Sequence, residues 1–277
     1  MTRLEWPKRI GAGTVALTMI GGGAATVRAQ GTTAGGSGAL TLNASLDAPS
    51  VYVLRGIVQE TDPKLTLAPE VDVAIRFGAA TVTLGSWHSL QTGSSGLDGP
   101  TARLHYEEDF YATLGVGVGR GLTVGATYRA YTSPGNMFNT VQEISVKAST
   151  PRLFNVSGQI AVEVDGAADG IDDGAGTYLE LGAAPTLPLG RRLRLTVPLR
   201  LGMSVNNYYQ QLDGHDTSFG FFAAGVLVAW PLSQSSRYGT WTVRGGVDVY
   251  GFGETTKTFN AGDTSKVVGT IGIGLTY

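Results

Sequence analysis

The final nine residues of the chain alternate between apolar side chains and polar or very small ones. Ile271, Ile273, Leu275 and Tyr277 share one parity, and Thr270, Gly272, Gly274 and Thr276 share the other. Successive side chains of a β-strand point to opposite faces, so this alternation predicts a strand with one apolar face. The same period of two recurs along the chain from residue 40, which restricts the protein to a fold made of amphipathic strands.

The alternation predicts an all-β protein: a transmembrane antiparallel β-barrel of about twelve strands. The predicted strands cover residues 40–58, 65–77, 81–90, 103–118, 122–131, 140–149, 154–164, 178–187, 192–205, 218–230, 240–252 and roughly 266–277. The connections that follow the odd-numbered predicted strands are mostly long and polar, and the connections that follow the even-numbered strands are mostly short. Bacterial outer-membrane barrels sort their loops in this way, whereas the alternatives, a soluble β-sandwich or a solenoid, have no reason to do so.

The first 29 residues have the pattern of a secretory signal peptide. Arg3, Lys8 and Arg9 give a basic start, an uncharged stretch follows, and Val27-Arg28-Ala29 offers a cleavage site after Ala29. A single membrane-spanning helix is the alternative, which the triplet 21–23 of glycines disfavours. We therefore predict two parts: a signal peptide over 1–29 and a barrel over 30–277.

The composition excludes several classes of protein. The chain has 20 basic and 22 acidic residues, of which four basic and one acidic lie in the predicted signal peptide. The remaining chain has 16 basic and 21 acidic residues and a net charge of −5. A mildly acidic chain without a basic block has no electrostatic basis for binding nucleic acid. The chain has no cysteine, which excludes disulfides and thiolate metal sites. We expect no cofactor and no metal.

Two resemblances carry further expectations. A terminal aromatic preceded by alternating apolar residues, as in 269–277, resembles the C-terminal assembly signal of Gram-negative outer-membrane barrels. The second resemblance rests on three segments in this order: Val51-Tyr52-Val53-Leu54-Arg55-Gly56-Ile57-Val58-Gln59, Gly85-Ser86-Trp87 and Gly176-Thr177-Tyr178-Leu179-Glu180. With them the chain resembles the TorF-like porin family, whose signature is a Tyr-x-x-Arg-Gly-x-x-Gln strand followed by a Gly-x-Trp strand. The resemblance implies a signal peptide, a barrel and a porin in the Gram-negative outer membrane.

In a membrane barrel the polar parity faces the lumen, so parity predicts the pore-lining residues. The predicted positive residues are Arg55, Arg76, Arg103, Arg129, Lys147, Arg194, Arg200 and Arg244, and the negative ones are Asp47, Glu70, Asp72, Glu107, Asp109, Glu143, Glu163, Glu180 and Asp248. A selective channel lines its constriction with charges of one sign, and this lining is mixed. Aromatic residues near strand ends are expected to form the interfacial girdles: Tyr106, Phe154, Trp230, Trp241 and Tyr277.

Two functions follow from a narrow barrel with a mixed lining. The first is a weakly selective diffusion pore for small hydrophilic solutes, and the second is a barrel plugged by ion pairs that conducts little. Arg55 is the principal lining residue on the first interpretation. On the second it is a buried residue that holds Asp47, Glu70 or Asp248 in place.

An enzymatic alternative depends on Ser86 and His88, which share a parity that faces lipid in the predicted barrel. Outer-membrane phospholipases and deacylases place a Ser and a His on that surface, in the pattern His-x-Ser with Asn close behind. Here the order is reversed and no Asn occurs between Ser86 and Gly135 to orient the imidazole, so we do not expect an enzyme. His105 and His215 have no partners at metal-ligand spacing.

The acidic loop 165–173 offers oxygen ligands for calcium without the spacing of an EF-hand. The simpler interpretation is a hydrated loop facing lipopolysaccharide. The partners expected from the sequence are outer-membrane lipid and lipopolysaccharide, the barrel-assembly machinery during insertion, and small solutes.

Overall fold

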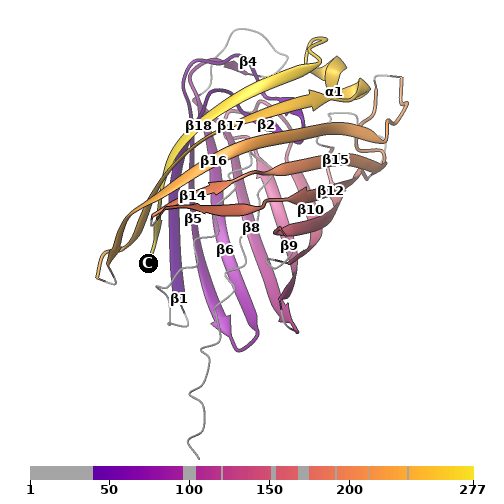
Figure 1. Cartoon of the computed structure of the whole chain (residues 1–277). Coiled ribbons are helices and arrows are strands. Elements are labelled where there is room, and N and C mark those ends of the chain that lie inside the picture. The colour runs from indigo at the N-terminus through magenta and orange to yellow at the C-terminus, as the bar shows by residue number, and fades with distance from the viewer. Residues whose placement is uncertain are drawn as a thin grey trace, which may run out of the picture.

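A computed structural model describes residues 40–95, 104–119, 121–150, 154–167, 175–190, 192–211, 213–235 and 237–277. The main sheet is one continuous antiparallel ladder that closes on itself (Figure 1). Its strands are β1 (Leu40–Pro49), β5 (Thr66–Phe77), β6 (Ala80–Gln91), β8 (His105–Val118), β9 (Leu122–Thr132), β10 (Val141–Thr150), β11 (Val156–Asp165), β12 (Thr177–Ala183), β13 (Thr186–Leu189), β14 (Leu193–Thr196), β15 (Leu199–Asn206), β16 (Phe219–Ser235), β17 (Gly239–Phe252) and β18 (Ser265–Thr276).

Prolines divide two of the barrel strands into halves. Pro185 separates β12 from β13, and Pro198 separates β14 from β15, because proline has no N–H to give to a ladder. The halves keep the same neighbours, since β12 pairs with β15 and β13 pairs with β14. The fourteen strands of the sheet therefore make twelve barrel strands, as the sequence predicts.

The first and last strands close the barrel. β1 pairs antiparallel with β18 over a register that runs from Asn43 opposite Thr276 to Pro49 opposite Thr270. In Figure 1 the yellow C-terminal strands accordingly lie beside indigo β1. Every barrel strand is antiparallel to its neighbours, so alternate connections lie at the same end. The longer ones gather at the end that holds β2 (Val53–Leu54), β4 (Glu60–Asp62) and α1 (Glu254–Phe259), which confirms the predicted sorting of loops.

The exposed fractions of the side chains follow strand parity. On β8, Phe110 and Leu114 point outward and are each 51% exposed, whereas Asp109, of the opposite parity, is fully buried at 0%. On β1, Leu40, Leu42 and Leu46 are likewise exposed. The outer surface of the barrel is thus apolar and its interior is polar. No helix among the residues that the structure describes is long and apolar enough to span a bilayer.

The prediction of a first strand over 40–58 is wrong beyond Pro49. Strand β1 ends there, and the chain folds into the barrel as a short hairpin, β2 (Val53–Leu54) and β3 (Ile57–Val58), followed by β4 (Glu60–Asp62), which pairs with β7 (Ser94–Ser95). The physical reason is local. A proline stands at the strand end, and Arg55 and Gly56 adopt positive φ values of 47° and 83°, a turn conformation that reverses the chain and does not continue a strand. Tyr52, which shares the parity of the outward residues Leu40, Leu42 and Leu46, is therefore buried in the interior.

The aromatic girdle is partly as predicted. Phe154, Trp241 and Tyr277 are exposed at strand ends or beside them, as expected. Trp230 is also exposed, but β16 continues to Ser235, so it lies within the strand. Tyr106 is buried, and its assignment to the girdle is wrong. A β-bulge of β8, opposite the step from Ser89 to Leu90 of β6, leaves Tyr106 without a pairing partner and directs it inward.

Candidate functional site: the interior of the barrel

The inward-folded hairpin occupies the interior at the end with the long loops. Its turn is fixed by α1: Asn260, the residue after the helix, accepts a hydrogen bond from the backbone N–H of Val58 (2.8 Å) and donates one to the carbonyl oxygen of Gly56 (2.8 Å). The hydroxyl of Tyr209 donates to the carbonyl oxygen of Arg55 at 2.9 Å. Loops that are distant in the sequence therefore hold the hairpin at one place.

Arg55 lies at the tip of this hairpin and pairs with Glu143 of β10. Two guanidinium nitrogens reach the two carboxylate oxygens at 2.6 and 2.9 Å, and one of them also donates to the Tyr208 hydroxyl at 2.8 Å. The guanidinium carbon lies 4.2 Å from the centre of the Tyr178 ring, a cation–π contact. Burial lowers the pKa of Arg55, but the charge and hydrogen bonds of Glu143, together with the neighbouring hydroxyls of Tyr208 and Tyr131, outweigh burial. The pKa is therefore raised above its ordinary value and the side chain stays cationic.

This pairing corrects the sequence-based expectation. Arg55 is inside the barrel, as predicted, but it does not lie on the strand that closes the barrel. Its partner is Glu143, rather than Asp47, Glu70 or Asp248. The sequence separation of 88 residues between the partners explains why no local pattern could indicate the pair.

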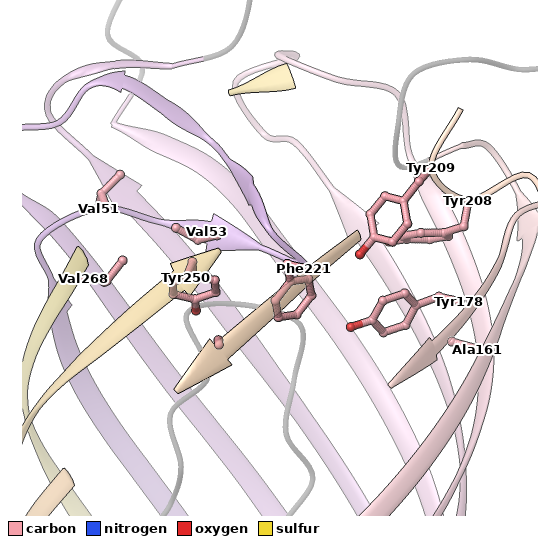
Figure 2. Close-up of a cluster of buried hydrophobic side chains, with 10 residues drawn as sticks. Val51, Val53, Ala161, Tyr178, Tyr208, Tyr209, Phe221, Tyr250 and Val268 are labelled. Atoms are coloured by element: carbon pink, nitrogen blue, oxygen red, sulfur yellow. The ribbon is translucent and has the colours of Figure 1, made fainter. Parts of the chain in front are cut away.

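A hydrophobic cluster surrounds the hairpin. Figure 2 shows Phe221 in the middle, with Val51, Val53, Tyr250 and Val268 on one side and Tyr178, Tyr208 and Tyr209 on the other. Phe221 belongs to β16, which covers the predicted strand 218–230. Its inward side is apolar because it packs on the hairpin: a Cβ added to Gly56 would lie 2.8 Å from the Phe221 ring.

The other side of the hairpin is joined to β6 and β8. Tyr52 donates from its hydroxyl to Glu107 at 2.9 Å and from its backbone N–H to Glu60 at 2.8 Å, and its ring lies 5.1 Å from that of Trp87. Glu60 also accepts two contacts from the Thr66 hydroxyl, at 2.6 and 2.8 Å. Burial raises the pKa of Glu60 above its ordinary value despite these hydrogen bonds, which lower it.

Three further arginines of the interior are also paired with carboxylates. Arg129 bonds to Asp109 at 2.7 Å, and Arg244 binds both oxygens of Asp47. Arg200 donates to the Tyr250 hydroxyl at 2.8 Å and lies 3.8 Å from Asp248. Positive and negative charges therefore neutralise one another locally within the interior.

The predicted lining residues divide by exposure. The buried ones are Asp47, Arg55, Asp72, Glu107, Asp109, Arg129, Glu143, Glu163, Arg200 and Arg244, and the half-buried ones are Glu70, Arg76, Lys147, Glu180, Arg194 and Asp248. Their role in lining a pore stays a prediction. Arg103, most of the acidic loop 165–173 and the predicted signal peptide 1–29 lie outside the described residues.

Sequence reasoning missed the neutral residues that shape the site. Tyr208, Tyr209 and Asn260 come from segments predicted to be polar loops, and each makes a buried contact with the hairpin. The Tyr208-Tyr209 pair in an otherwise polar loop was the available signal, because adjacent aromatic residues are seldom left to solvent.

Ser86 and His88 lie on the same face of β6, as predicted. However, the ring nitrogen Nδ1 of His88 contacts His105 Nε2 at 3.1 Å and lies 3.7 Å from Glu108 Oε1. Within the part of the chain that the structure describes, no hydrogen bond joins Ser86 to His88. The pair therefore lacks the nucleophile–base contact of a serine hydrolase.

Comparisons with known proteins assign no residue of this chain a role. No protein-family model matches the sequence, and no curated protein matches it. The solved structure of NanC porin is 11% identical over 86% of this chain and 99% of that chain, with a TM-score of 0.46. KdgM porin is 7% identical over 85% and 98%, with a TM-score of 0.44. OmpF of Salmonella typhi, in complex with daunomycin, is 9% identical over 86% and 97%, with a TM-score of 0.40.

The resemblance to TorF-like porins stays a prediction. Its main motif, residues 51–59, is now located in the inward-folded hairpin instead of a barrel strand.

Proposed function

We propose that the protein is a porin-like channel of the Gram-negative outer membrane, narrow and weakly selective, for small hydrophilic solutes. The observation that carries the proposal is the combination of an apolar outer surface with a polar, ionic interior in a closed barrel. A soluble protein of this size would bury its apolar faces, whereas this chain exposes them around the barrel and buries its charges.

The dimensions of the apolar surface support a membrane location. On β8 the outward residues from Phe110 to Val118 are exposed and, apart from Ala112, large and apolar. Eight residue steps at about 3.3 Å cover roughly 26 Å along the strand. With a tilt of about 40° this becomes about 20 Å across the membrane, close to the ~25 Å apolar band of outer-membrane barrels.

The arrangement of the interior favours a narrow solute path that discriminates little between anions and cations. The hairpin that ends in Arg55 narrows one end of the barrel, so solutes would pass beside the Arg55–Glu143 pair. Because each of the four paired arginines has a carboxylate neighbour, the field along this path is mixed in sign. Strong selectivity requires an excess of one sign, so we expect a weak preference between anions and cations.

Half-buried polar side chains line the interior away from the hairpin. Lys147, Gln159 and Arg194 point inward from their strands and retain partial exposure, which favours a hydrated interior over a dry one. With the long loops outside the cell, the hairpin lies at the extracellular mouth, where lipopolysaccharide surrounds the barrel. Insertion by the barrel-assembly machinery is part of the same proposal.

Liposome swelling with uncharged sugars of increasing size tests the function. Liposomes that contain the refolded protein should swell in a pentose, more slowly in a hexose, and hardly in a trisaccharide. Heat-denatured protein in the same lipid is the control. If folded protein gives no swelling with any sugar, the barrel is plugged and the channel proposal is wrong.

A further inference from the structure

Two histidines and a glutamate meet on the outer surface of the barrel, at the ends of β6 and β8 that carry the long connection. Strand pairing places His88 directly opposite Glu108. The β-bulge between Ser89 and Leu90 turns both Tyr106 and Glu107 inward, and it thereby brings His105 round to the outward face beside His88. The bulge thus assembles a cluster that regular pairing would have divided between the two faces.

The three side chains are arranged as ligands of one ion. His88 Nδ1 and His105 Nε2 are 3.1 Å apart, His88 Nδ1 and Glu108 Oε1 are 3.7 Å apart, and the ligand atoms all lie within 4.8 Å of one another. Two nitrogens that bind a tetrahedral metal at 2.0–2.1 Å are separated by about 3.4 Å. The observed separations therefore need only small side-chain adjustments to hold an ion.

The cluster lies near one end of the outer surface of the barrel, and its side chains are only partly covered. The neighbouring outward row towards the middle of the barrel contains Val71 and Phe110, both exposed and apolar. His88 and Glu108 form the next row, and their side chains are 24% and 26% exposed. The row beyond, towards the long connection, holds His105 beside Leu90 and Leu67. The cluster is therefore a polar group near the end of the two strands, next to the long connection.

We infer that His88, His105 and Glu108 form a binding site for a divalent transition-metal ion of the zinc type. Imidazole nitrogens with one carboxylate suit zinc, copper or nickel, whereas calcium and magnesium prefer ligand sets made of oxygen alone. Three protein ligands leave one coordination position for water. A bound ion would join β6 to β8 at the ends that the long connection links. The inference is independent of whether the barrel conducts.

The histidine content makes the test specific. The chain has three histidines and no cysteine, so His215 provides a matched control. His215 lies in the exposed loop between β15 and β16, outside the cluster. The variants are His88→Ala, His105→Ala and Glu108→Gln, with His215→Ala as the control. Heat-modifiable gel migration verifies that each barrel is folded.

Zinc binding to the metal-free, refolded full chain is measured by competition with a chromogenic chelator. We expect one zinc ion per chain, unchanged binding in His215→Ala, and at least about tenfold weaker binding in each cluster variant that folds. Absence of saturable zinc binding, or equal binding by His215→Ala and the cluster variants, would overturn the site.

A measurement on the unsubstituted chain covers the case in which the variants do not fold. One equivalent of Cu²⁺ should give an electron paramagnetic resonance spectrum with hyperfine coupling to two nitrogens. A spectrum of copper coordinated by oxygen alone would contradict the assignment.

Discussion

Replacing Arg55 with alanine should release the hairpin from the interior of the barrel. The substitution removes both hydrogen bonds to Glu143, the hydrogen bond to Tyr208 and the cation–π contact with Tyr178. It also leaves the Glu143 carboxylate, which is only 3% exposed, without a counter-charge. Removing one partner of a buried ion pair costs about 3–5 kcal/mol, mainly through the charge left behind.

This magnitude can be expressed as a population. A loss of about 3–5 kcal/mol raises the open fraction of the hairpin by roughly 10²- to 5 × 10³-fold, at 1.36 kcal/mol for each factor of ten. The backbone N–H groups of Val58 and Gln59 report this opening, because they are hydrogen-bonded to Asn260 and to Tyr52 within the docked hairpin. Their hydrogen-exchange rates should rise by the same factor in Arg55→Ala.

The matched control is Lys64→Ala in the same connection. Lys64 lies 3.8 Å from Asp62, and both side chains are about two-thirds exposed, at 65% and 68%. An exposed pair of this kind contributes about 0–1 kcal/mol, so exchange should change little. The double variant Arg55→Ala with Glu143→Ala should recover part of the lost protection, since it removes the unpaired charge. If Arg55→Ala exchanges at the wild-type rate, the pair does not hold the hairpin and the reasoning fails.

Three further predictions concern the barrel and the turn. Leu199→Arg should impair membrane insertion by about 2–4 kcal/mol if Leu199 faces the middle of the bilayer, whereas Gln159→Arg, which faces the interior, should insert normally; equal membrane yields would mean that the assigned parity is wrong. Gly56 and Gly78 both have a positive φ, but only Gly56 lies against Phe221. Gly56→Ala should therefore destabilise the hairpin by about 1–3 kcal/mol more than Gly78→Ala destabilises the β5–β6 turn, as measured by hydrogen exchange. The folded barrel should migrate differently on a gel before and after boiling, and identical migration would contradict a stable barrel.

The repeating part of the fold was predictable from the sequence. Alternation along a strand such as residues 193–203 is a local property, and it correctly indicates which side chains face outward. The strand count and the sorting of long and short connections follow from the same pattern, because each strand must cross the same thickness.

The inward-folded hairpin was not predictable from alternation alone. The parity of residues 51–59 continues that of a barrel strand, but Tyr52 and Leu54 pack against Trp87 and Tyr106 instead of lipid. Val51 and Val53, on the other side of the segment, pack in the cluster around Phe221. Two signals were available: a predicted first strand of 19 residues exceeds the 9–11 that a crossing needs, and Pro49 and Gly56 lie within it. The pairs Arg55–Glu143 and His88–His105 depend on tertiary placement and on a bulge, which single-sequence periodicity does not reveal.

Single-channel recording in a planar bilayer tests the central claim, that a hairpin-narrowed, charge-balanced interior conducts. Refolded protein under a salt gradient should give stable small steps with a reversal potential near zero. Arg55→Ala should give larger steps or frequent openings to a higher level, because the hairpin no longer stays docked. A silent bilayer with protein shown to be folded, for both the wild type and Arg55→Ala, would contradict the channel and leave a plugged barrel.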